Sequence, residues 1–171
     1  INAPQKNKKK FYEENIQTAS FIMGQHNLDK KLLSKAKKLK AIINVESNFM
    51  KNMDYEYCFK KGIHVIATSP VFSKPVAEIA LGMTLSLLRN IHIAHSDFVN
   101  GKEKYGLVSN LNASLLSEKK IGLLGFGDLA KSLYPLLLPF TKDINVYDPW
   151  VPKTKIKKLK PMRPLAIVKT L

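Results

Sequence analysis

The chain has 171 residues, of which 45% are hydrophobic and 24% charged. This composition is typical of a folded soluble protein and excludes global disorder, and the length fits one full domain or two incomplete ones. Cys58 is the only cysteine, so an internal disulfide is excluded and we expect a reducing compartment, the cytoplasm. Arg89, Asp97 or a glycine interrupts the apolar stretches, so we expect no membrane span.

The formal net charge is +15, which raises the possibility of nucleic-acid binding. The excess lies at the two ends, because residues 1–40 and 151–171 each carry +7 and residues 41–150 carry only +1. The basic residues are 26 lysines and two arginines, whereas proteins that read bases or clamp phosphates favour arginine. We therefore expect a solvated lysine-rich surface and no nucleic-acid partner, with DNA binding as the alternative.

The first half of the chain alternates between strand and helix patterns. We expect residues 1–15 to form a frayed or exposed opening, because they are polar and basic. Strands are predicted at 18–23, 41–45 and 63–68, and helices at 28–39 and 55–61. This alternation is typical of a parallel sheet with crossover helices.

After a loop expected around Pro70 and Pro75, the pattern predicts one long helix from residue 76 to about 99. Its first part is apolar on nearly all sides, so we expect it to be buried on most sides, between domains or between subunits. Residues 100–118 have an irregular pattern. The alternation then returns, with strands predicted at 120–124 and 144–147, a helix at 128–138 and a short helix near 154–159.

A glycine loop joins the strand and the helix predicted at 120–138. Its sequence contains G-x-G-x-x-A, a permitted form of the dinucleotide-binding fingerprint. Gly125 allows a tight turn, Gly127 lets the backbone approach a diphosphate, and Ala130 lets the helix pack closely on the strand. The N-terminus of the following helix offers N–H groups and a positive dipole end to phosphates.

An aspartate ends the next predicted strand. Asp148 lies 21 residues after Gly127, close to the spacing of the carboxylate that binds the adenosine ribose. A carboxylate there accepts from both ribose hydroxyls and repels a 2′-phosphate, which favours NAD over NADP. The alternative is a glycine turn and a capping aspartate with no nucleotide.

Trp150 follows Asp148 by two residues. Its side chain either covers the edge of the adenine or packs against the protein, and packing is the simpler expectation. The predicted cofactor-binding residues are Gly125, Phe126, Gly127, Asp128, Leu129 and Asp148.

Three segments, 61–91, 119–140 and 144–150, resemble the D-isomer-specific 2-hydroxyacid dehydrogenases in order and spacing. The resemblance implies an α/β fold with doubly wound parallel sheets. Residues 1–75 would be part of a flavodoxin-like substrate domain. Residues 76–171 would be the interdomain helix and the first half of a Rossmann NAD domain.

The resemblance also implies a function: hydride transfer between NAD(H) and a small 2-hydroxy or 2-oxo acid. Family members bind substrate through a loop that corresponds to Glu46, Ser47 and Asn48, where many have glycines. The family's catalytic Arg, His and acidic residue lie later than Leu171, so we assign no catalytic residue, and no metal ligand.

Two further expectations follow from the same resemblance. Arg89 matches the family's arginine at the end of the long helix, and we expect it to form a structural ion pair. The full-length protein would be a homodimer formed through the long helix and residues 100–118. The alternative function is a non-catalytic nucleotide-binding or interaction module of the same fold.

Overall fold

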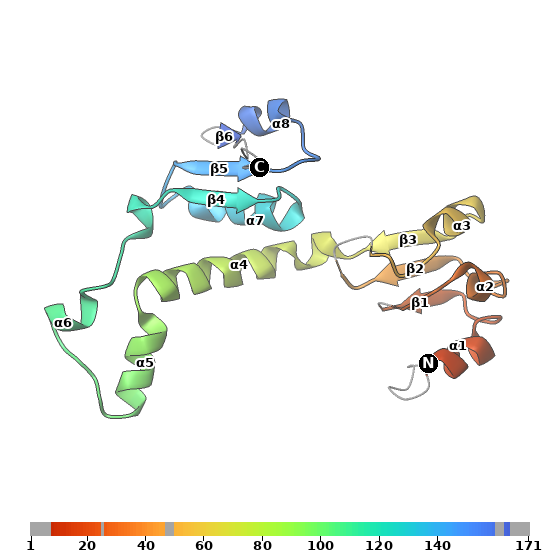
Figure 1. Cartoon of the computed structure of the whole chain (residues 1–171), viewed down its shortest axis with the longest axis horizontal. Helices are drawn as coiled ribbons and strands as arrows, with labels where there is room; N and C mark the ends of the chain where they lie inside the picture. The colour runs from red at the N-terminus through yellow and green to blue at the C-terminus, as the bar shows by residue number, and fades with distance from the viewer. Residues whose placement is uncertain (1–7, 25, 47–49, 160–162, 165–171) are drawn as a thin grey trace, which may run out of the picture. The chain divides into compact units, whose positions relative to one another are not determined.

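The computed structural model describes residues 8–24, 26–46, 50–159 and 163–164. The chain divides into two compact units, Ile1–Ser69 (unit 1) and Pro70–Leu171 (unit 2), and the division lies six residues before the predicted boundary. Each unit contains a three-stranded parallel sheet, with strand orders β1-β2-β3 and β4-β5-β6 (Figure 1). The predicted α/β class with parallel sheets is confirmed.

Unit 1 follows the predicted alternation of strands and helices. Its elements are α1 (Lys8–Asn15), β1 (Phe21–Met23), α2 (Lys30–Leu33), β2 (Ala41–Asn44), α3 (Tyr55–Lys60) and β3 (His64–Ala67). The register places Ile22, Ile42 and Val65 side by side across the sheet. Ile22 and Ile42 are buried in a core that also contains Leu28, Leu33 and Cys58. The sheet is therefore anchored on the face that these residues share.

Two predictions for unit 1 were wrong in their extent. Residues 8–15 form a helix rather than a frayed opening, because Tyr12 packs against the core and Ile16, just after the helix, is buried in it. The helix predicted at 28–39 is only four residues long, capped by Asp29. Turns follow it and still bury Ala36 and Leu39, so the apolar periodicity marked inward positions rather than a continuous helix.

Unit 2 contains the returning alternation. Its elements are α4 (Ser69–Leu88), α5 (Ile91–Val99), α6 (Leu107–Asn110), a 3₁₀ helix η1 (Leu116–Glu118), β4 (Ile121–Leu124), α7 (Asp128–Leu137), β5 (Ile144–Tyr147), α8 (Lys153–Lys158) and β6 (Arg163–Pro164). Ile144 and Val146 are fully buried in a core to which Phe126 and Leu137 also belong. The predicted strands and helices of residues 120–159 are confirmed within one or two residues.

The long helix differs from its prediction at both ends. It starts at Ser69, so Pro70 and Pro75 lie in a helix rather than in a loop. Pro70 is tolerated because the first turn of a helix has no internal use for its N–H. The helix stops at Leu88, and Asn90 adopts a left-handed conformation, with φ of 54°, before α5 begins. Asparagine is one of the few residues that tolerate this conformation.

Helix α4 is also more exposed than its apolar sequence predicts. By length and composition alone it is the one helix in the described ranges that could cross a membrane, and the core helix of a soluble protein meets the same criteria, so the absence of a membrane span stays a prediction. Leu81, Leu85 and Leu88 pack against the core of unit 2, whereas Met83 and Leu87 are exposed. The helix thus has one packed side and one apolar side without a partner in the described ranges.

Candidate functional site

The glycine loop has an open backbone. Gly125 has φ of 89°, a left-handed conformation in which a side chain is strained, so the turn out of β4 requires glycine. Gly127 has ordinary dihedral angles, and a Cβ built on it meets no atom within 4 Å. The fold alone therefore does not require glycine at position 127, and the bare backbone there leaves room for a ligand.

Two hydrogen bonds tie this loop to the end of β5. The Gly125 N–H donates to the Tyr147 carbonyl at 2.7 Å, and the Phe126 N–H donates to Asp148 Oδ2 at 2.6 Å. The register, which pairs Leu124 with Tyr147, places the loop and Asp148 at the same carboxyl edge of the sheet. Ligands of open α/β sheets bind at this edge.

Asp148 also organises the turn that follows it. Its Oδ1 accepts the N–H groups of Trp150 at 2.8 Å and Val151 at 2.9 Å. Partial burial acts to raise the pKa of Asp148. The N–H groups of Phe126, Val151 and Trp150, together with the positive charge of Lys131, outweigh that effect and hold the pKa below its ordinary value. The carboxylate is therefore charged and fixed in place at neutral pH.

The other predicted cofactor residues have distinct surroundings. The Phe126 side chain is buried and packs edge to face against Tyr134, with ring centroids 6.4 Å apart. Leu129 is partly exposed, and Asp128, in the first turn of α7, lies 3.6 Å from Lys131 Nζ. The N-cap of α7 is Gly127, which supplies no capping side chain. The start of α7 thus keeps its backbone accessible to an anion.

Trp150 does not pack against the protein, in contrast to the simpler expectation from the sequence. Its side chain is 86% exposed, two residues beyond Asp148. It is the only tryptophan of the chain, so its fluorescence reports on this edge of the sheet.

The predicted substrate residues follow β2 in unit 1. Glu46 is exposed, while Ser47 and Asn48 lie outside the described residues. Sequence reasoning missed Asn44, which is fully buried at the carboxyl end of β2. Its amide has no partner in good hydrogen-bonding geometry, although the Tyr55 hydroxyl is close enough to interact with it. A polar residue at the end of the apolar run of residues 41–43 was the available signal.

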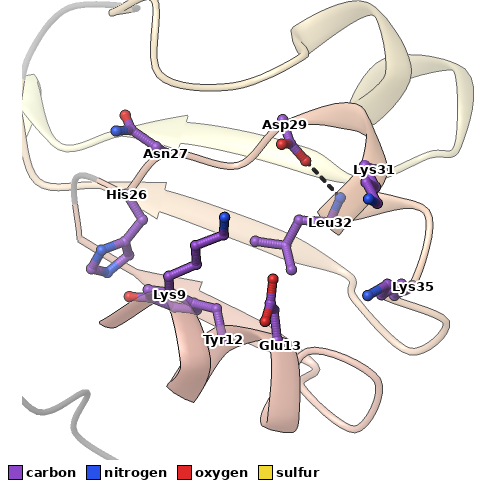
Figure 2. Close-up of a pocket in the computed structure, with 9 residues that line it drawn as sticks. All are labelled: Lys9, Tyr12, Glu13, His26, Asn27, Asp29, Lys31, Leu32 and Lys35. Carbon is purple, nitrogen blue, oxygen red and sulfur yellow. Dashed lines mark hydrogen bonds between the residues drawn. The ribbon is translucent and has the colours of Figure 1, made fainter. Parts of the chain in front are cut away.

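A cavity of about 590 Å³ lies in unit 1, among α1, the β1–α2 connection and α2 (Figure 2). Lys9 and Glu13 extend from α1 toward Leu32, and Lys31 and Lys35 border the opposite side. No predicted site residue lines it. Its charged side chains are exposed. The cavity is lined by none of the residues of the site described above.

Two minor expectations can also be checked. Arg89 is exposed and forms none of the ion pairs found in residues 8–159, so the predicted ion pair was wrong for the described part of the chain. Within the same part, no group of three His, Cys, Asp or Glu side chains is placed to hold a metal.

A parallel sheet whose first strand runs into an open glycine loop, with an acid at the end of the second, is typical of dinucleotide-binding α/β proteins. The sequence profile of the D-isomer specific 2-hydroxyacid dehydrogenase catalytic domain matches residues 3–158. The chain belongs to this family.

Individual relatives agree with this assignment. Hydroxypyruvate reductase of Thermotoga maritima is 34% identical over 106 residues, covering 61% of this chain and 33% of the relative. The crystal structure of a phosphoglycerate oxidoreductase from Rhizobium etli is 40% identical with a TM-score of 0.64, covering 91% of this chain and 48% of that one. D-lactate dehydrogenase of Aquifex aeolicus, solved with NAD and lactic acid, is 25% identical with a TM-score of 0.70, covering 90% of this chain and 45% of that one. The chain thus spans between a third and a half of these relatives.

We expect Asp148→Asn to change how stability depends on pH. The pKa of Asp148 is lowered in the folded chain, so its contribution to stability is complete above the unfolded-state pKa of about 4 and is lost as pH falls through the lower folded value. At pH 7 the substitution should reduce the free energy of unfolding by about 1–2 kcal/mol, since it removes the charge of the acceptor and replaces one accepting oxygen with an NH₂ donor that faces an N–H group.

Urea unfolding followed by Trp150 fluorescence measures this effect. The difference between the two proteins should shrink at acid pH. A difference that stays constant from pH 7 to the acid range would contradict the role given to the Asp148 charge.

Proposed function

We propose that this chain provides the dinucleotide-binding half of an NAD-dependent oxidoreductase that transfers hydride between NAD(H) and a small 2-hydroxy or 2-oxo acid. Unit 1 would belong to the substrate domain, and unit 2 would supply the interdomain helix and the first half of the NAD domain. The observation that carries the proposal is the open glycine loop hydrogen-bonded to Asp148, in a chain that matches the family over residues 3–158.

Each residue of the loop has a defined task in this proposal. Gly125 turns the backbone, and Gly127 and the N-terminus of α7 receive the diphosphate. Phe126 anchors the loop through its buried ring, and its N–H fixes the Asp148 carboxylate, which accepts from the adenosine ribose. The bound cofactor supplies the hydride chemistry. The fixed negative charge of Asp148 disfavours a 2′-phosphate, which supports NAD rather than NADP.

The substrate side is proposed more coarsely. The loop after β2 carries Glu46, Ser47 and Asn48 and would bind the acid through backbone N–H groups. The exposed Glu46 carboxylate repels an anionic acid unless it points away from it, so we expect Glu46 to face solvent. We assign no catalytic residue within these 171 residues and no particular acid.

We propose the cytoplasm as the location, in keeping with the single, buried Cys58. We also propose that neither a membrane nor a nucleic acid is a partner.

The apolar side of α4 is instead an assembly surface, together with exposed apolar side chains on α5, on α6 and just after α6. This apolar face comprises Ile79, Met83, Leu87, Ile91, Phe98, Leu107, Val108 and Leu111. Exposed apolar surface of this extent is typical of protein–protein interfaces, and we propose a homodimer.

Gly127→Ala should weaken NAD binding without affecting stability. The added methyl group meets no atom of the protein but occupies the space over the loop where the diphosphate would approach. We expect the dissociation constant, measured by titration of Trp150 fluorescence, to rise at least about tenfold, a change of about 1.4 kcal/mol. Gly82→Ala, which also meets no atom, is the matched control and should bind as the unchanged chain does. Equal affinity of both variants would contradict a diphosphate site at this loop.

A hydride-transfer assay separates the dehydrogenase from a non-catalytic module. Oxidation of NADH with glyoxylate or hydroxypyruvate is followed for this chain and for a longer version that covers its relatives' length. We expect activity in the longer version only, because this chain supplies cofactor-binding but no assigned catalytic residues. Activity in neither protein would favour the non-catalytic nucleotide-binding or interaction module.

Phe98→Glu should weaken the proposed dimer. Phe98 lies on α5 with 68% of its side chain exposed, and a buried unpaired carboxylate at an interface is costly. Phe59→Glu, on α3 of unit 1 and 59% exposed, is the matched control. Sedimentation should show dimers for the unchanged chain and the control and a shift toward monomers for Phe98→Glu. An unchanged chain that is monomeric at high concentration would refute the dimer.

A further inference from the structure

The Asp148 carboxylate has little hydrogen-bonding capacity left. A carboxylate offers about four acceptor positions, two on each oxygen. Both positions of Oδ1 are used by the Trp150 and Val151 N–H groups, and one of Oδ2 by the Phe126 N–H. About one position therefore remains, on Oδ2. An adenosine ribose carries two neighbouring hydroxyl groups. In contrast to the expectation from the sequence that the carboxylate accepts from both, Asp148 can accept from one of them, and the other needs a different protein partner.

A second charged group lies within electrostatic reach of Asp148. Lys131, in the second turn of α7, has its Nζ 3.6 Å from Asp128 Oδ1, and its charge also attracts the Asp148 carboxylate. Its side chain is 58% exposed, so the ammonium group is accessible to a ligand. An ammonium group only donates, and it therefore complements a hydroxyl oxygen that Asp148 leaves without a partner.

Lys131 also compensates for an unfavourable charge. Asp128 stands in the first turn of α7, at the end where the diphosphate is expected, and a carboxylate there repels an anionic ligand. The contact with Lys131 neutralises this carboxylate locally. The same lysine thus forms an ion pair with Asp128 and attracts the Asp148 carboxylate electrostatically.

We propose that Lys131 is a second ribose-binding residue, whose ammonium group donates to the adenosine ribose hydroxyl that Asp148 does not bind and offsets the charge of Asp128 beside the diphosphate. This inference rests on the proposed NAD site and adds a residue that the G-x-G-x-x-A pattern does not include. A 2′-phosphate would meet attraction from Lys131 and repulsion from Asp148, so the two residues together set the preference between NAD and NADP.

Binding measurements with ADP and its deoxy analogues test the ribose contact. The full chain and Lys131→Met are titrated with ADP, 2′-deoxy-ADP and 3′-deoxy-ADP by calorimetry. Lys131→Met should weaken ADP binding on the order of fivefold, as expected for a partly exposed charged hydrogen bond. The loss should largely disappear with the analogue that lacks the contacted hydroxyl, because a contact already absent from the ligand cannot be lost again.

Lys142→Met is the matched control. Lys142 is an exposed lysine of unit 2 that takes part in none of the ion pairs found in the described residues, and its substitution changes the net charge equally. It should bind all three ligands nearly as the unchanged chain does. Thermal unfolding of both variants checks that the fold is retained.

The outcomes separate this inference from the proposed function. Equal weakening of all three ligands by Lys131→Met shows a general charge effect or a structural role, and it overturns the ribose contact while leaving the NAD site intact. Affinities unchanged by Lys131→Met overturn it as well. Failure of the unchanged chain to bind either ADP or NAD overturns the proposed function, and this inference with it.

Discussion

The hydrogen bond from the Phe126 N–H to the Asp148 carboxylate is the contact on which the proposed site depends. It joins the turn after β4 to the end of β5, two segments that are 22 residues apart in the chain. Parallel pairing of the strands brings these segments to one edge, but pairing alone leaves the loop free to adopt other turns. The charged acceptor selects one of them, in which Gly125 is left-handed and Gly127 has nothing above it. The site is thus shaped before any ligand is present, which lowers the entropic cost of binding.

The same bond explains why the loop residues are so different in burial. Phe126 directs its ring into the core against Tyr134 while its N–H points to Asp148, so the residue holds the loop from both sides. The Tyr134 hydroxyl donates to the Leu159 carbonyl at 3.3 Å, and Ile156 of α8 is buried in the same core. The segment after Asp148 is therefore held at its start by the carboxylate and near its end by Tyr134. Trp150, between these anchors, remains exposed.

Much of this arrangement was predictable because it depends on local rules. The glycine turn, the apolar strands on either side of it and the position of Asp148 follow from spacing and from the backbone needs of glycine. The three N–H donors to Asp148 were not predictable. Those of Trp150 and Val151 depend on how the turn at residues 148–151 folds back, and that of Phe126 depends on how the loop after β4 meets the end of β5. The ion pair of Lys131 with Asp128 and its electrostatic effect on Asp148 were missed for a similar reason, because a lysine on a helix surface carries no sequence signal of its partner.

The errors have a common physical origin in the competition between local preference and packing. Pro70 and Pro75 favour a loop by their local chemistry, yet the apolar residues after them make a helix that starts earlier and includes both. Residues 28–39 have helical periodicity, yet the chain must return to begin β2 beside β1, and turns bury Ala36 and Leu39 equally well. In the second case the pattern identified which side chains face inward and misjudged the backbone that carries them. The glycine loop escapes this ambiguity, because a positive φ at Gly125 is a requirement on the backbone itself, and a pattern that specifies backbone rather than burial is the more reliable guide to a site.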